Sequence, residues 1–149
     1  MKQPIILTFL LFISCGTNSK QSEASDQRDD DRIACALTFV NEYIKEYSSP
    51  EELNKWLHGN ELTTDSFRAE YKRIVDDGWK TDPEMGLGYD PILESQDCPD
   101  QGYELDFVDE KTGYIHLRGK GEDQFKIVIN VIEKDSKYLV DGSGIVNMP

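Results

Sequence analysis

The chain has 149 residues, of which 29 are Asp or Glu and 16 are Lys or Arg, so its formal net charge is −13 at pH 7. This acidic balance disfavours a nucleic-acid partner, because phosphate binding needs clustered Lys and Arg. Hydrophobic residues make up 38% of the chain and come in periodic blocks. This pattern indicates a folded domain and argues against a wholly disordered acidic chain.

The first residues have the features of an export signal. Lys2 precedes an apolar stretch over residues 4–13, and the small Ser14 closes this stretch just before Cys15. A bilayer-spanning helix needs about 20 apolar residues, so this stretch is too short to cross a membrane. We therefore expect a secretory signal peptide over residues 1–14.

The residues that end this signal resemble a lipoprotein motif. Phe12-Ile13-Ser14-Cys15 is similar to the lipobox of bacterial lipoproteins, although the family usually has Leu where this chain has Phe12. In that family the cysteine is acylated, for example with palmitate, and becomes the first mature residue. The resemblance implies a lipid anchor on Cys15 and a place in the cell envelope, at the outer membrane on its periplasmic or surface face. The alternative is an ordinary cleaved signal with an incidental cysteine.

A polar segment follows, and then the first amphipathic pattern. Residues 15–31 are rich in Ser, Gln and Asp without apolar periodicity, which predicts an acidic disordered tether. Residues 32–149 are expected to form a single domain. From Arg32 to Tyr47, apolar residues recur at spacings of three and four and predict a helix with one hydrophobic face: Ile33, Leu37, Val40, Ile44 and Tyr47.

Two further helices are expected before residue 80. Ser49-Pro50-Glu51-Glu52 is typical of a capping box with proline at the first helical position, and Gly59 ends this short helix. A third helix is expected to begin at Thr63, where Leu62 and Phe67 occupy the positions of a hydrophobic staple. Gly78 is expected to stop it.

The second half of the chain changes to a period of two. Apolar and polar residues alternate over residues 103–107, 114–118 and 125–131, and a last strand is expected near residues 138–146. Tyr103, Leu105 and Phe107 are expected to share one buried face. Short polar turns between the strands favour an antiparallel meander. The predicted fold class is α+β, with three N-terminal helices packed on a curved four-stranded antiparallel meander sheet.

Two cysteines remain once Cys15 is assigned to lipid. Cys35 and Cys98 would then lie in a compartment where disulfides persist, so we expect a disulfide between them. The alternative is a pair of free buried thiols, which behave as small hydrophobic side chains.

A second resemblance covers residues 33–146. The order of elements, the helical motif Phe39-Val40-x-x-Tyr43 and above all the stretch Asp90-Pro91-Ile92-Leu93-Glu94-Ser95-Gln96-Asp97 resemble an uncharacterised family of small Gram-negative envelope proteins, many of them lipoproteins. The resemblance implies a nuclear-transport-factor-2-like or cystatin-like fold, in which a curved sheet wraps a long helix. It implies little about function.

The segment over residues 76–100 is the best candidate for a site, because so long a stretch without regular structure is unusual in a compact domain. Its candidate binding residues are Trp79, Tyr89, Asp90, Gln96 and Asp97. Asp90 and Asp97 would serve as an acid–base pair if they lay within a few ångström of each other and one were desolvated. In the alternative they cap turns through backbone amides.

No motif for catalysis or for metal binding occurs. His58 and His116 lack HxH or HExxH spacing, and His116 alternates with apolar residues, so it is expected on the sheet face away from the core. No GxSxG motif, phosphate-binding loop or dinucleotide fingerprint is present. We expect no catalytic residue, no metal and no cofactor.

The sequence thus favours a lipid-anchored envelope protein that acts as a non-catalytic binding module. Its partner would be an envelope protein, a peptide or a small ligand, and an inhibitor or immunity-type protein is one form of this function. The alternative is a pocket enzyme of the nuclear-transport-factor-2-like fold that uses Asp90 or Asp97 as acid or base. A purely structural role in an envelope assembly is a third hypothesis.

Overall fold

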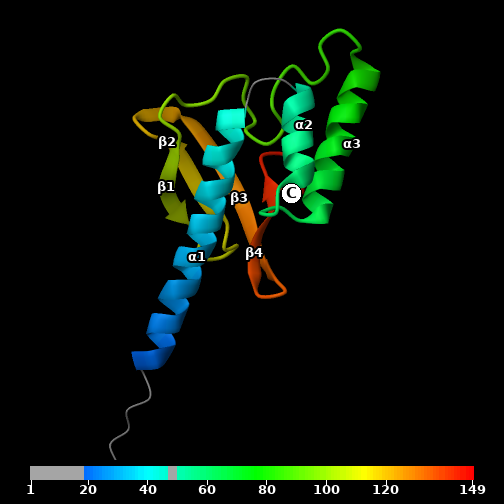
Figure 1. The fold of residues 1–149 in the computed structure, drawn as a ribbon. Coiled ribbons are helices and arrows are strands. Elements are labelled where there is room, and N and C mark those ends of the chain that lie inside the picture. The colour runs from blue at the N-terminus through cyan, green and yellow to red at the C-terminus, as the bar shows by residue number, and fades with distance from the viewer. Residues whose placement is uncertain (1–18, 47–49) are drawn as a thin grey trace, which may run out of the picture.

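The structure is a computed structural model, and it describes residues 19–46 and 50–149. In these residues helices come first and a sheet follows, so the predicted α+β class is confirmed (Figure 1). The elements are α1 (Ser19–Tyr43), a 3-10 helix η1 (Ile44–Glu46), α2 (Pro50–Gly59), α3 (Asp65–Thr81), β1 (Tyr103–Val108), β2 (Ile115–Gly119), β3 (Glu122–Lys134) and β4 (Lys137–Ser143).

The four strands form one sheet in the order β1-β2-β3-β4, and every neighbouring pair is antiparallel. The predicted strands are therefore all present. The edge at β4 is extended by the chain before α3, because the Val140 N–H donates to the Leu62 carbonyl at 2.8 Å and the Thr64 N–H donates to the Val140 carbonyl at 3.0 Å. These hydrogen bonds hold the start of α3 against β4.

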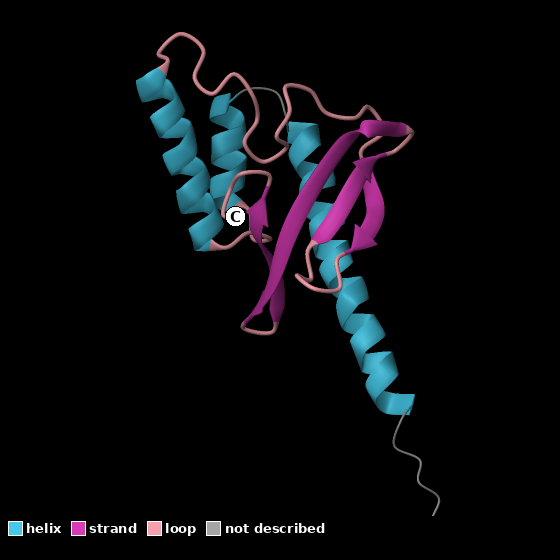
Figure 2. Ribbon diagram, turned by 180° about the vertical axis from the view of Figure 1, so that it is seen from behind, coloured by secondary structure: helices cyan, strands magenta, loops and turns pink. Residues whose placement is uncertain are grey.

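The helices do not all cover the sheet in the way the sequence predicts. Helix α1 crosses one face of the sheet, whereas α2 and α3 lie side by side beyond β4 (Figures 1 and 2). An aromatic cluster joins the three helices: the Phe39 ring lies 5.7 Å from that of Phe67 and 6.1 Å from that of Trp56. The helix pair therefore packs mainly against α1 and the β4 edge, and none of the helices within residues 19–46 and 50–149 covers the face of the sheet opposite α1 (Figure 2).

Helix α1 begins earlier than predicted. It starts at Ser19, inside the segment that we expected to be a disordered tether. Near its exposed middle, Gln27 bonds to Asp31 and Arg32 pairs with Asp29, which are helical spacings of four and three residues. Such pairs stabilise the N-terminal part of the helix, which has no apolar face of its own. Periodicity alone misses a helix of this kind.

Helix α3 begins within two residues of its predicted start at Thr63 and ends later than predicted. Thr64 is the N-cap, and its Oγ1 accepts a bond from the Phe67 N–H at 3.0 Å. The helix continues through Gly78 to Thr81. A Cβ on Gly78 would lie 2.7 Å from Cγ of Leu87, so this glycine allows the following loop to pack closely against the helix. It is not a stop signal.

The first strand departs from the predicted alternation. Its pairing with β2 shifts register between Leu105 and Phe107, so Phe107 pairs with His116. The Phe107 and His116 rings stack with centroids 4.1 Å apart, and Phe107 is 50% exposed. Phe107 thus lies on the face opposite the core, because a bulge reverses the side-chain alternation beyond it. The prediction that it shares a buried face with Tyr103 is wrong.

Candidate functional site

The predicted site segment is divided between the core and the surface. Asp90, Pro91, Ile92 and Leu93 are buried, whereas Trp79, Tyr89, Gln96 and Asp97 are exposed. The two halves are adjacent because the chain folds back on itself: the Asp90 N–H donates to the Ser95 carbonyl at 2.8 Å, and Gln96 Nε2 donates to the Gly88 carbonyl at 2.9 Å.

Asp90 is the best-connected carboxylate of this segment. Its Oδ1 accepts the backbone N–H groups of Ile92 and Leu93, each at 2.8 Å, and so caps the turn that follows. Its Oδ2 accepts the hydroxyl of Tyr43 at 2.5 Å. Tyr43 comes from α1 and is fully buried, so this bond fixes the loop to the central helix. Asp90 acts as an anchor for the loop.

Burial is the largest cause of the raised pKa values of Asp90 and Tyr43. Desolvation raises the pKa of Asp90, while the hydrogen bonds from Tyr43 and from the Leu93 and Ile92 amides lower it in part. The pKa of Tyr43 is raised well above its ordinary value, first by burial and then by the charge of Asp90 and by Tyr71, with which it shares a hydrogen bond. The two side chains and Tyr71 form a buried polar network, which is stabilising because its donors and acceptors are matched.

Asp97 does not join Asp90 in a carboxylate pair. Asp97 is exposed, and its backbone N–H donates to Ser95 Oγ at 3.2 Å within a local turn. Asp90 directs both carboxylate oxygens at donors of its own chain. An acid–base pair needs a proton shared between two carboxylates, or one of them open to a substrate. The arrangement matches the turn-capping alternative for Asp90, whose carboxylate accepts two backbone N–H groups, whereas in the turn at Asp97 the accepting side chain is Ser95.

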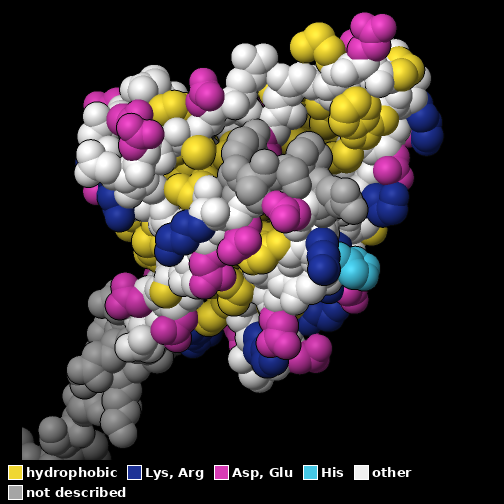
Figure 3. Space-filling model, turned by 45° about the horizontal axis from the view of Figure 1, so that its top comes forward, with side chains coloured by type: hydrophobic (Ala, Val, Ile, Leu, Met, Phe, Trp, Pro, Cys, Tyr) yellow, Lys and Arg dark blue, Asp and Glu magenta, His cyan; other side chains and the backbone are white. Residues whose placement is uncertain are grey.

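Exposed hydrophobic side chains gather beside this anchor. Trp79 is 45% exposed, Met85 69% and Tyr89 41%, and all three belong to the end of α3 and the loop after it. Figure 3 shows hydrophobic side chains collected at this end of the molecule. We call Trp79, Met85 and Tyr89 the tip surface. Apolar side chains that gather on an exposed surface are typical of interaction sites.

The tip surface contains a residue that the sequence analysis missed. Met85 was not among the candidates, because a single methionine in a loop has no periodic pattern. One signal was available in the sequence: residues 81–110 contain no Lys, Arg or His. This run sets the segment apart from the rest of the chain, which carries all 16 basic residues.

The two cysteines of the described domain are free thiols in the structure. Cys35 is buried, its Sγ lies 3.3 Å from the Tyr138 carbonyl of β4, and burial raises the pKa of its thiol to about 11. Cys98 is half-buried and precedes β1, at the other edge of the sheet, and burial with the nearby charge of Asp97 raises its pKa. The alternative of two free thiols describes this structure, and the disulfide stays a prediction. Cys15 lies outside the described residues.

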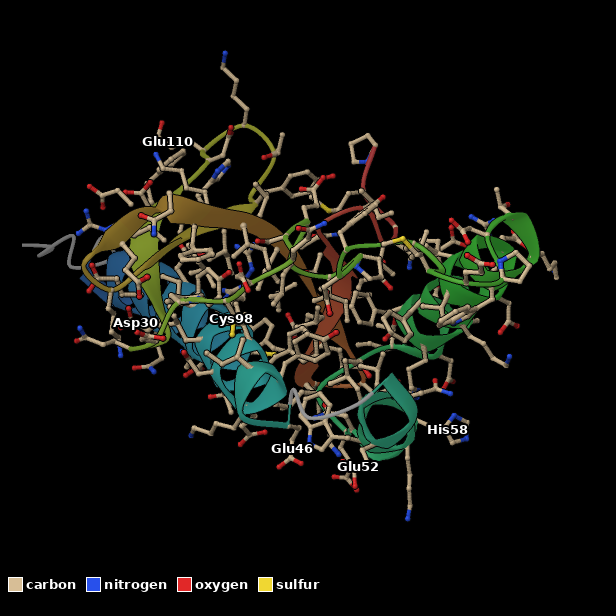
Figure 4. All side chains as sticks on the ribbon, turned by 90° about the horizontal axis from the view of Figure 1, so that it is seen from above. Asp30, Glu46, Glu52, His58, Cys98 and Glu110 are labelled. Carbon is tan, nitrogen blue, oxygen red and sulfur yellow. The ribbon has the colours of Figure 1, made fainter. Side chains whose placement is uncertain are left out.

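A hollow lies between the α2–α3 connection and the β3–β4 hairpin. It has a volume of about 430 Å³ and is lined by His58, Arg68 and Lys134, among other residues. Arg68 already has partners within the chain, because its guanidinium donates to the Asn60 and Thr63 carbonyls and pairs with Asp65. His58 points away from the body of the molecule (Figure 4). None of the predicted site residues lies here.

Neither a metal site nor a membrane span is found in the part of the chain that the structure describes. No group of three or more His, Cys, Asp or Glu side chains within residues 19–46 and 50–149 is placed to hold a metal ion. Among the same residues, no helix combines the length and the apolar character needed to cross a bilayer.

Comparison with known proteins yields one distant structural neighbour. No protein-family model matches this chain, and no curated protein matches it. The crystal structure of a protein of unknown function from Bacteroides thetaiotaomicron is similar to it, with a TM-score of 0.50 and 15% sequence identity over 83% of this chain and 96% of that chain. At this identity the likeness concerns the fold alone. The chain therefore shares its overall fold with that protein.

Proposed function

We propose that this protein is a non-catalytic binding module of the cell envelope, held there by a lipid on Cys15, and that the tip surface contacts its partner. One observation carries the proposal: the best-placed carboxylate of the segment, Asp90, is bonded through both oxygens to its own chain, while Trp79, Met85 and Tyr89 beside it are exposed. A buried anchor next to exposed hydrophobic side chains suits binding and does not suit proton transfer.

The anchored loop also supports binding energetically. Three hydrogen bonds to Asp90 and the bond between Gln96 and Gly88 hold the loop before any partner arrives. A partner then loses less free energy to ordering the loop, which favours affinity. Trp and Tyr are common among the residues that dominate binding, because they bury much area and have few rotatable bonds.

The same proposal includes location and the finer fold. A lipid on Cys15 would be separated from the domain by the N-terminal part of α1, where residues 19–31 extend about 18 Å at 1.5 Å per residue. Figure 1 follows this part of α1 away from the sheet. The consecutive antiparallel strands with α1 across one face support the expected curved meander of the nuclear-transport-factor-2-like or cystatin-like type.

The test is site-specific photocrosslinking in the cells that make the protein. A photoreactive phenylalanine analogue replaces Tyr89 in one variant and Glu110 in a matched control, since Glu110 is also exposed and lies across the molecule from α3 (Figure 4). We expect one discrete crosslinked partner from position 89 and none from position 110, with a weaker yield when Cys15→Ser removes the anchor.

Two results would contradict the proposal. One is equal crosslinking from both positions, or none from position 89, which would remove the tip surface from partner binding. The other is turnover of an envelope substrate by the purified full chain that is lost in Asp97→Asn, because the protein would then be an enzyme. Metabolic labelling with palmitate, lost in Cys15→Ser, tests the anchor separately.

A further inference from the structure

The tip surface lies in the most strongly charged part of the chain. Residues 81–110 carry ten acidic residues and no Lys, Arg or His: Asp82, Glu84, Asp90, Glu94, Asp97, Asp100, Glu104, Asp106, Asp109 and Glu110. Not all ten surround the tip surface, because Asp90 is buried, Glu104 pairs with Arg118, and Glu110 lies across the molecule from α3 (Figure 4). A surface with charge of one sign attracts partners of the other sign and repels those of its own.

Three exposed carboxylates in the segment between α3 and β1 are not neutralised by ion pairs. Among the described residues, no Lys or Arg forms an ion pair with Glu84, Glu94 or Asp97, and all three are exposed. We call these three residues the acidic rim. Their charges are therefore available to a partner.

The basic residues of α3 do not cancel this charge, because they are paired on their own helix. Arg73 pairs with Glu70 at 2.6 Å and with Asp77 at 2.9 Å, and Lys80 pairs with Asp77 at 2.9 Å. Lys72 pairs with Asp76 at 2.6 Å. Helix α3 thus brings the aromatic Trp79 to the tip without a free positive charge.

The acidic rim and the tip surface belong to one folded unit. The Asp82 carboxylate accepts the N–H groups of Glu84 and Met85, each at 3.0 Å, and a Cβ on Gly86 would lie 3.1 Å from the Trp79 ring. Gly86 has a φ of +64°, so a residue without a side chain suits both the backbone and the packing of the indole. The chain after Gly88 then folds back through Gln96, which brings Asp97 to the same unit.

We propose that the tip surface binds a lysine- or arginine-rich segment of a partner protein, with an apolar side chain of that segment against Trp79, Met85 and Tyr89. This inference rests on the proposed function and names the chemistry of its partner. The exposed indole and phenol rings also offer faces to cations, which adds to the attraction of the carboxylates. An anionic lipid surface or a nucleic acid meets repulsion from the acidic rim.

The experiment titrates the full chain with three synthetic peptides that differ only in charge. Each peptide repeats a unit of leucine, glycine and one variable residue. The variable residue is lysine in the first peptide, glutamate in the second and serine in the third. NMR follows the indole N–H signals, with Trp79 as the probe and the half-buried Trp56 as an internal control. We expect the lysine peptide to shift the Trp79 signal and to bind at least about tenfold more tightly than the other two.

Salt and variants then test the acidic rim. Raising the ionic strength shortens the screening length from about 30 Å at 0.01 M to about 8 Å at 0.15 M, so we expect the lysine peptide to bind more weakly in salt. The double variant Glu84→Lys with Asp97→Lys should weaken it by about tenfold or more, and Glu110→Lys by less than about twofold. If the double variant loses its dispersed NMR spectrum, Glu84→Gln and Asp97→Asn take its place.

Three outcomes overturn the inference. They are equal binding of the serine or glutamate peptide, equal weakening by Glu110→Lys, and a shift of the Trp79 signal by anionic phosphatidylglycerol vesicles. The proposed function fails differently, through the absence of a crosslink at position 89. If that crosslink forms but its site on the partner lies in a neutral or acidic segment, the proposed function stands and this inference is wrong.

Discussion

Two neighbouring stretches of the chain, the end of α3 with the start of the following loop and the later part of that loop, have opposite environments. Trp79, Met85 and Tyr89 are 41–69% exposed, whereas residues 90–93, which follow directly, are 5% exposed or less at Asp90, Ile92 and Leu93. The difference arises from one carboxylate. Asp90 caps a turn and bonds to Tyr43 of α1, and this draws its neighbours into the core.

The polar residue with the most hydrogen bonds in a loop need not be its functional residue. Asp90 lies in the core side of the loop, where a charge is tolerated only with several hydrogen bonds. The hydrophobic residues lie on the solvent side, where their exposure costs free energy unless a partner covers them. We therefore assign a role in stability to Asp90 and a role in binding to Trp79, Met85 and Tyr89. Mutation tests each assignment.

The largest expected effect comes from Asp90→Ala. The substitution leaves the Tyr43 hydroxyl and the amides of Ile92 and Leu93 without their acceptor in a buried place. Each such loss is costly, so we expect a fall of about 3 kcal/mol in the free energy of unfolding, measured by urea denaturation. Asp97→Ala is the matched control, and it should leave the urea midpoint unchanged. Equal effects of the two substitutions would abolish the distinction between anchor and surface.

Tyr43→Phe is a milder change at the other end of the same bond. It keeps the ring in the aromatic cluster and removes only the hydroxyl that donates to Asp90. We expect a loss of about 1 to 2 kcal/mol in the free energy of unfolding. The same change in an Asp90→Asn background should cost less, because a bonded pair is coupled. Identical costs in both backgrounds would mean that the pair does not interact.

The pH dependence of stability gives a smaller and more specific signal. Burial raises the pKa of Asp90 above its ordinary value of 3.8, so the folded protein holds this proton more tightly than the unfolded chain does. The stability from this group is fully present below the unfolded pKa and is lost as the pH rises through the folded pKa. We expect the free energy of unfolding of the wild type, relative to Asp90→Asn, to fall as the pH rises above about 4.

Urea denaturation of both proteins across that pH range measures this difference. Exposed carboxylates titrate equally in the two proteins and cancel in the subtraction. A relative stability that rises with pH would indicate that the three hydrogen bonds outweigh desolvation and that the pKa of Asp90 is lowered.

Much of the fold was predictable from local sequence. Alternating residues identified three of the four strands, the Ser49–Glu52 pattern located α2, and Leu62 with Phe67 indicated a start of α3 at Thr63, one residue before the observed N-cap. These signals are short in range, so the residues that carry them need no knowledge of the rest of the molecule. The turn-capping role of Asp90 was among the alternatives for the same reason.

Features that depend on tertiary contacts were not predictable. The bond between Tyr43 and Asp90 joins residues 47 positions apart, and the glycine at position 78 serves packing with Leu87. The bulge that moves Phe107 to the opposite face leaves the alternating pattern of the sequence intact. Trp79 lies on α3 because the helix continues past Gly78, whereas the sequence predicted a loop at this position.

The smallest expected effect on stability, and the sharpest contrast with Asp90, comes from Trp79→Ser and Tyr89→Ser. Both side chains are more than 40% exposed, so their removal should change the free energy of unfolding by no more than about 0.5 kcal/mol. The same variants should lose the crosslinked partner, because a tip surface built for binding contributes to the complex and little to the fold. Urea denaturation and crosslinking from a neighbouring exposed position, Met85, measure the two effects on the same proteins. A loss of 2 kcal/mol or more, of the order expected for a core aromatic, would mean that the indole is part of the fold. In that case the chain would be buried at Trp79 as well as at residues 90–93. Trp79 would then stabilise the fold and would not belong to a binding surface.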